Sequence, residues 1–121
     1  MGEQKIRVLI ANSTRVLRDL LYDAIRKQPG IEIVGDVSEE SAILPVAERT
    51  NADCVIVPLG EDGIAASCTQ ILSQRPNVRI LAIGEGTNVL ALYWRCSKGD
   101  VRCTYSTASR KNILQALQFS A

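Results

Sequence analysis

Short runs of β-branched and aliphatic residues alternate along this chain with segments of helical character, and this alternation limits the fold more than any other feature. Each run is followed by a helical segment, so the chain predicts five strand–helix units. Runs that are apolar throughout, each followed by a crossover helix, indicate a parallel sheet covered by helices on both faces. The five expected strands are Lys5–Ala11, Ile31–Asp36, Asp53–Val57, Val78–Ile83 and Asp100–Tyr105.

Capping and stop signals bound the helical segments. The first is expected to be capped by Asn12 or Ser13 and carries an apolar stripe over Val16–Ile25. The second is weaker and reaches Thr50. Its regular part is expected to start late, because Pro45 disfavours a helix interior. The other three are expected at Ile64–Arg75, at Thr87–Lys98, and from Ser106 or Thr107 to Phe119.

Composition bounds the kind of protein. A chain of 121 residues fits one domain, which we assign to residues 1–121. The net charge of +1 gives no basis for a nucleic-acid or membrane partner. No apolar run approaches a membrane span and no secretory signal is evident, so a cytoplasmic protein is expected. The four cysteines lack CxxC spacing and there is no histidine, which favours reduced core cysteines over a zinc site.

Ligands of an open parallel sheet bind outside the carboxyl ends of its strands. This chain places little reactive chemistry there. The missing histidine removes the commonest general base. The turn carboxylates Glu61, Asp62 and Glu85 are most simply solvated. The segment Gly84–Thr87 before an expected helix could cradle a phosphate, but a plain turn is the simpler interpretation. We therefore expect no catalytic residue, no metal site and no cofactor.

Several segments resemble a known family. Ile6–Ala11, the amphipathic segment after it and Pro29–Gly35 look like the start of a bacterial response-regulator receiver domain, most closely the subfamily with a C-terminal helix-turn-helix. Asn51–Val57 and Arg75–Leu81 are similar to the same family around its third and fourth strands. The resemblance covers residues 5–118. It implies a doubly wound (βα)5 three-layer sandwich of the flavodoxin-like type, with a parallel five-stranded sheet in the order 2-1-3-4-5.

The resemblance also implies a phosphorylation pocket, and this chain lacks its reactive residues. The family holds magnesium with an acidic pair after the first strand, where this chain has Asn12 and Ser13. The family's phosphoacceptor aspartate corresponds to Pro58, which has no nucleophilic group. The hydroxyl residue that ends the family's fourth strand corresponds to Gly84, and its lysine after the fifth strand corresponds to Ser106. The pocket is therefore degenerate, and no phosphoswitch is expected.

The expected function follows from this combination of a kept fold and a lost pocket. We expect a pseudo-receiver of a two-component system, a phosphorylation-independent module of a transcriptional response regulator that contacts a protein partner or its own effector domain. That effector could lie beyond Ala121. The family's switch positions correspond to Gly84 and Cys103. Two alternatives stay open: a small-molecule sensor that uses the vacated pocket, and residual phosphotransfer through Asp62 or Ser13.

The expected fourth helix predicts the contact surface. Helical spacing turns Val89, Leu92, Tyr93 and Cys96 inward and leaves the apolar side chains of Leu90 and Trp94 on an exposed flank. Arg95, Lys98 and Arg102 would form the rim. In receiver domains the fourth helix, fifth strand and fifth helix form the dimerisation face, so the resemblance implies a homodimer through this surface. The basic residues lack the aromatic partners of a nucleic-acid site, so direct nucleic-acid binding is not expected.

Overall fold

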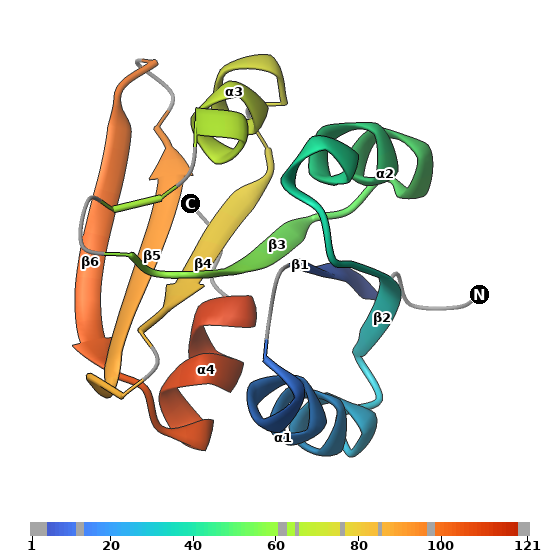
Figure 1. Ribbon diagram of the computed structural model, residues 1–121, viewed down its shortest axis with the longest axis vertical. Helices are drawn as coiled ribbons and strands as arrows, with labels where there is room; N and C mark the ends of the chain where they lie inside the picture. Colours follow the sequence, from blue (N-terminus) through green and yellow to red (C-terminus); the bar gives the residue numbers. More distant parts are fainter. Residues whose placement is uncertain are drawn as a thin grey trace.

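The computed structural model describes residues 5–11, 14–60, 63–64, 66–75, 77–84, 86–96 and 99–118. Strands and helices alternate as far as the fourth strand, and two strands then follow each other directly (Figure 1). The elements are β1 (Ile6–Ala11), α1 (Arg15–Arg26), β2 (Ile31–Val37), the 3₁₀ turn η1 (Glu40–Ala42), α2 (Ile43–Thr50), β3 (Cys54–Pro58), α3 (Ala66–Gln74), β4 (Arg79–Ile83), β5 (Val89–Arg95), β6 (Val101–Thr107) and α4 (Arg110–Leu117).

The strands form one six-stranded mixed sheet in the order β2-β1-β3-β4-β5-β6. Strands β2, β1, β3 and β4 are parallel neighbours. The pairs β4–β5 and β5–β6 are antiparallel. The prediction of a purely parallel, five-stranded, doubly wound flavodoxin-like sheet is therefore wrong, because an extra strand takes the place of the expected fourth crossover helix.

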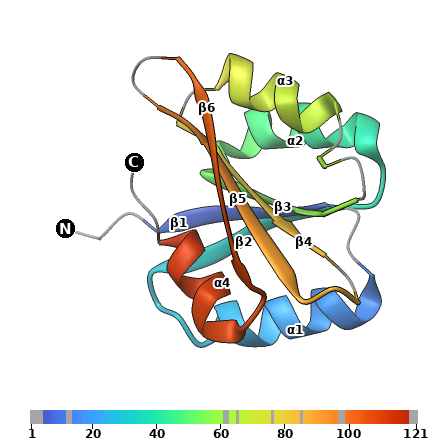
Figure 2. The ribbon, with the colours of Figure 1, turned by 90° about the vertical axis from the view of Figure 1, so that its left-hand side faces the viewer.

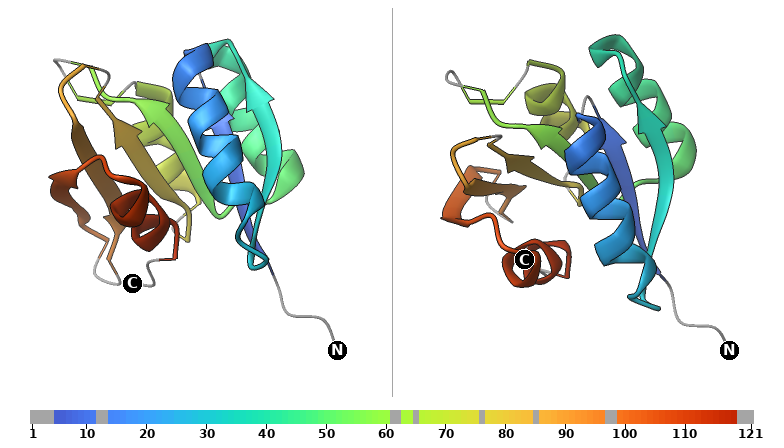
Figure 3. Two further views of the ribbon diagram at one scale, coloured as in Figure 1. Left: turned by 90° about the horizontal axis from the view of Figure 1, so that it is seen from below. Right: turned by 60° about the horizontal axis from the view of Figure 1, so that its bottom comes forward.

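Helices cover both faces of the sheet. Helices α1 and α4 lie on one face and α2 and α3 on the other (Figures 1 and 3). The first face buries alternate strand residues such as Val8, Ile56 and Leu81 against the two helices. The second face buries the intervening residues, such as Leu9 and Val55. Burial of both faces explains why β1, β3 and β4 are apolar except for Arg7 and Arg79 near their amino ends.

The segment expected as the fourth helix is the antiparallel strand β5. Leu90 and Leu92 face the core under α1 and α4, whereas Ala91 faces the core under α2 and α3. Almost every residue of β5 is apolar, so helical and strand periodicities both fit the segment. The strand is bounded by two turns. Asn88 has a φ of 58° before β5 and Gly99 a φ of 92° after it, and both are backbone states typical of hairpin connections.

The first two helices begin close to where the sequence places them. Thr14, and not Asn12 or Ser13, caps α1, and its hydroxyl accepts the Leu17 N–H at 3.3 Å. Residues 12 and 13 lie outside the described part of the chain. The late start of the second helix is confirmed, because η1 precedes α2 and Pro45 lies in the first turn of α2.

Helix α1 buries a narrower stripe than its sequence suggests. Leu17, Leu21 and Ile25 are in the core, but Val16 is 82% exposed and Leu20 44% exposed. The exposed pair lies one helical turn apart on the outer side of the helix.

Helix α4 is tied to the sheet at both ends. Ser109, rather than Ser106 or Thr107, caps its first turn by accepting the Asn112 N–H at 3.1 Å. At the other end the guanidinium Nη2 of Arg79 donates to the Leu117 carbonyl at 3.0 Å.

Burial raises the pKa of Cys54, which lies beside Arg79, to about 12, so this core thiol is protonated at neutral pH.

Candidate functional site

Among the described residues of the expected pocket, the structure keeps Pro58 near Gly84 but separates Ser106 from both. Pro58 and Ile83 are neighbours across β3 and β4, Ile83 pairs with Leu90, and Leu90 pairs with Ser106. Ser106 therefore lies two strands away from β4, at about 10 Å for the usual strand spacing. The resemblance would have placed it on the strand beside β4. Asn12 and Ser13, also expected in this pocket, lie outside the described residues.

The space beside Gly84 is occupied. Gly84 is buried, and its N–H donates to the Val89 carbonyl at 2.8 Å in the tight turn between β4 and β5. A Cβ atom at this position would overlap the Thr87 hydroxyl. The loop is a hairpin turn and no helix follows it, so the helix amino end that a phosphate cradle would need is missing from Gly84–Thr87.

Pro58 has a structural role at the end of β3. Among the described residues, β3 pairs with β1 as far as Ile56, and the Leu59 N–H donates to the Ile83 carbonyl on the β4 side. Proline lacks a backbone N–H, so Pro58 donates no main-chain hydrogen bond at the end of β3. It also contributes no reactive group.

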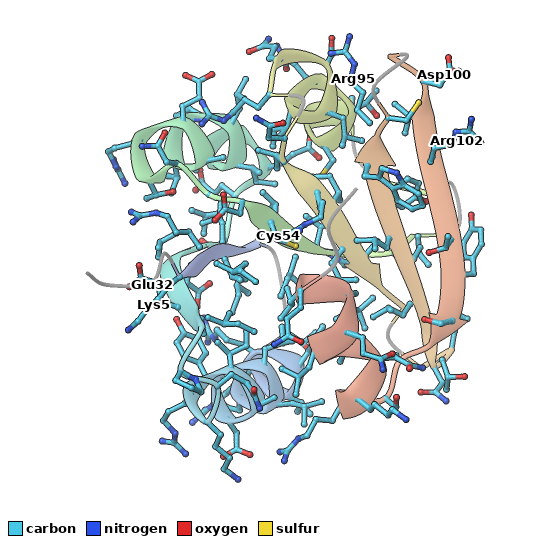
Figure 4. All side chains as sticks on the ribbon, turned by 180° about the vertical axis from the view of Figure 1, so that it is seen from behind. Lys5, Glu32, Cys54, Arg95, Asp100 and Arg102 are labelled. Carbon is cyan, nitrogen blue, oxygen red and sulfur yellow. The ribbon has the colours of Figure 1, made fainter. Side chains whose placement is uncertain are left out.

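The predicted interface residues divide between the core and the surface. Leu90 is 3% exposed, so the prediction that it lies on an exposed flank is wrong. Trp94 is half-buried against the core under α1 and α4. The Nη1 group of Arg95 donates to the Ser73 carbonyl at 2.9 Å, which ties β5 to the end of α3. Arg102 is exposed on β6 (Figure 4). Lys98 lies outside the described residues.

The fifth expected strand, Asp100–Tyr105, is confirmed as β6, but the sequence analysis did not foresee its antiparallel pairing or its exposure. It forms one edge of the sheet, and all seven of its residues are exposed (Figure 2). Val101 is 51% exposed and Tyr105 67% exposed. Natural edge strands are usually short, bulged or protected by lysine or proline. Residues 101–107 contain neither lysine nor proline. An open and nearly uncharged edge is therefore the candidate site.

The backbone of β6 presents alternate residues to this free edge. The Cys96 N–H donates to the Asp100 carbonyl at 2.8 Å, and the Ala108 N–H donates to the Asn88 carbonyl at 3.0 Å. Even-numbered residues of β6 therefore bond to β5, and odd-numbered residues point their N–H and C=O groups outward. The outward carbonyl of Thr107 accepts from the Ser109 N–H and from Asn112 Nδ2. Val101, Cys103 and Tyr105 remain as the outward-facing set.

Val101, Cys103 and Tyr105, whose backbone groups point to the free edge, all have their side chains on the face of the sheet that α2 and α3 cover. Cys103 lies directly opposite Tyr93, and Tyr105 is the diagonal neighbour of Tyr93. Burial, with charge interactions and side-chain hydrogen bonding involving Cys103 and Tyr105, raises the pKa of Tyr93. The phenol group of Tyr93 is therefore uncharged at neutral pH. Tyr93, Val101, Cys103 and Tyr105 are hereafter the edge cluster.

A polar cleft of about 350 Å³ lies at the opposite end of the sheet, by the amino ends of β3 and β4. The Asn51 side-chain carbonyl accepts from Arg75 Nη2 at 3.2 Å, and the Asp53 carboxylate accepts the Arg7 N–H at 2.9 Å. These bonds hold the loops before β3 and β4. Among the described residues no cluster of three or more metal-ligating side chains occurs.

Neither a scan against protein-family models nor a search of curated proteins found a match to this chain. Within the described residues, every helix is too short or too polar to cross a membrane.

Proposed function

We propose that this chain is a phosphorylation-independent regulatory module of the cytoplasm, which acts through protein contacts at the free edge of β6. The observation that carries the proposal is the edge itself, with seven exposed residues and three residues whose backbone groups point away from the sheet. Edge strands of this kind bind by adding a strand from a partner, because main-chain hydrogen bonds supply affinity and alternate side chains supply specificity.

The remaining part of the proposal comes from the resemblance to receiver domains, and the parallel order of β2, β1, β3 and β4 is consistent with it. On this view the module belongs to a transcriptional response regulator and passes its signal to a partner or to its own effector domain. Contact replaces phosphorylation, since Pro58 cannot accept a phosphoryl group and Ser106 lies two strands from β4.

A protein partner is favoured over a small molecule. The sensor alternative needs an open pocket at the carboxyl ends of the strands, and in the described part of these loops Thr87 occupies the space beside Gly84. The edge of β6, by contrast, is a seven-residue exposed strand with a regular backbone pattern. Such a surface suits an extended polypeptide better than a compact ligand.

Photo-crosslinking in cells tests the proposal. A photoreactive phenylalanine analogue replaces Tyr105 in one variant and Val16 in another, since both side chains are exposed but lie on β6 and α1 respectively. We expect a defined protein adduct from position 105 and none from position 16. An adduct confined to position 16, or no adduct from position 105, would refute contact through the β6 edge.

A further inference from the structure

We infer that the partner at the β6 edge is a second copy of this chain, paired antiparallel about a two-fold axis at Cys103. The inference rests on the proposed function, because it names the occupant of the same surface. A two-fold axis brings the same patch of both copies together, so a self-complementary strand is the requirement. The pairing would join two six-stranded sheets into one continuous sheet.

The backbone groups select the register. With the axis at Cys103, Val101 pairs with Tyr105 of the second copy and Cys103 pairs with its own equivalent. All outward N–H and C=O groups of the three residues then find partners. An axis at Thr104 would instead require the Thr107 carbonyl, which already accepts from Ser109 and Asn112. The register at Cys103 uses the outward N–H and C=O groups of Val101, Cys103 and Tyr105 and does not require the Thr107 carbonyl.

The side chains agree with this register. On the α2/α3 side, each Val101 meets a Tyr105, and cross-strand pairs of an aromatic with a β-branched residue stabilise sheets. Cys103 meets Cys103 beside Tyr93. The pairing removes the exposed apolar surface of the edge cluster from water, where Tyr105 is 67% exposed and Val101 51% exposed.

The charges also favour a second copy. Arg102 is the only charged residue within β6, and in this register it lies opposite Thr104, so the two arginines do not face each other. Asp100 is the only acidic residue of the hairpin, and it lies opposite Ser106 of the second copy. There it approaches the amino end of α4, where the helix dipole favours a negative charge and Lys111 adds a positive one, while Arg110 at this end pairs with Asp23 at 2.7 Å. Figure 4 shows Asp100 and Arg102 at the outer margin of β6.

Disulfide trapping tests the register in the purified chain. Residues in a hydrogen-bonded antiparallel pair have Cα atoms about 5.5 Å apart, within the roughly 4.4–6.8 Å that a disulfide spans. Mild oxidation with copper phenanthroline should therefore yield a covalent dimer through Cys103. Cys103→Ser should abolish this product, whereas Cys96→Ser should keep it. A cross-link that survives in Cys103→Ser would overturn the proposed axis.

Charge pairing at the axis tests the association without oxidation. Cys103→Lys and Cys103→Glu each oppose like charges across the axis, so each should weaken the dimer about tenfold or more. Their equimolar mixture should recover the dimer, while Cys103→Ser alone stays dimeric. Sedimentation measures association, and circular dichroism checks that each variant folds.

The outcomes separate the two proposals. A chain that stays monomeric, or variants that do not recover on mixing, would overturn self-association. If position 105 still crosslinks to a different protein in cells, the proposed function stands and only the second copy is excluded. If position 105 yields no adduct and the chain is monomeric, both proposals fail.

Discussion

Trp94 and Tyr105 are aromatic residues of one hairpin, and their surroundings differ. Trp94 is half-buried against the core under α1 and α4, whereas Tyr105 is 67% exposed. Trp94→Ala should lower the free energy of unfolding by about 2–3 kcal/mol, somewhat less than a fully buried aromatic. Tyr105→Ala should cost less than about 1 kcal/mol, because most of its side chain is already in water.

Urea unfolding of both variants, measured below the concentration at which the chain associates, checks this residue-scale prediction. Equal costs for the two substitutions, or a larger cost at Tyr105, would contradict the burial of Trp94. The original expectation of an exposed Trp94 required almost no loss of stability, so the same measurement separates the helical and the strand assignment of residues 89–95.

At the scale of elements, the turn between β4 and β5 brings the Thr87 hydroxyl close to Gly84. A methyl group at Gly84 would overlap the Thr87 hydroxyl, so Gly84→Ala should destabilise the fold by about 1–3 kcal/mol. Removal of that hydroxyl makes room for the methyl group. In a Thr87→Ala background, the cost of Gly84→Ala should therefore fall below about 1 kcal/mol.

Thermal unfolding of the wild type, both single variants and the double variant completes this cycle. Independent, additive effects at the two positions would show that Thr87 does not occupy the space beside Gly84. That result would also restore the open pocket required by the small-molecule alternative.

At the scale of the whole molecule, the strand order separates Ser106 from the other described residues of the expected phosphorylation pocket. Pro58→Asp adds a carboxylate at the end of β3, but Ser106 stays two strands from β4 and the space beside Gly84 stays filled. Residues 12 and 13 still supply no carboxylate for magnesium. Neither the wild type nor Pro58→Asp should gain a phosphoryl group.

Intact mass measurement after incubation with acetyl phosphate and magnesium tests this prediction. A labile adduct of one phosphoryl group per chain on the wild type would support residual phosphotransfer through another residue. The same adduct on Pro58→Asp alone would show that a single carboxylate suffices for the chemistry.

Local sequence patterns were enough to predict β1, β2, β3 and β4 and the helices between them. Their apolar runs are short, and a helix-limiting residue such as Pro45 lies in the first turn of its helix. The absence of a phosphate-accepting group at position 58 could also be read directly, since proline has no reactive group in any fold. These conclusions depend on chemistry within a few residues, which the sequence contains.

Only the tertiary structure decided that residues 89–95 form a strand and not a helix. The candidate site at β6 depends on that decision. The apolar run of six residues from Val89 to Trp94 fits a buried helix and a strand that is buried on both faces, so periodicity could not choose. Its pairing with β4 and β6 decided, and the positive φ values of Asn88 and Gly99 were the local signals of that choice. Once β5 is a strand, Leu90 enters the core, Ser106 moves away from β4, and β6 pairs antiparallel with β5 and has every residue exposed. The expected strand order also ended on residues 100–105, but the exposure of an edge strand depends on the elements packed around it, which no local pattern reveals.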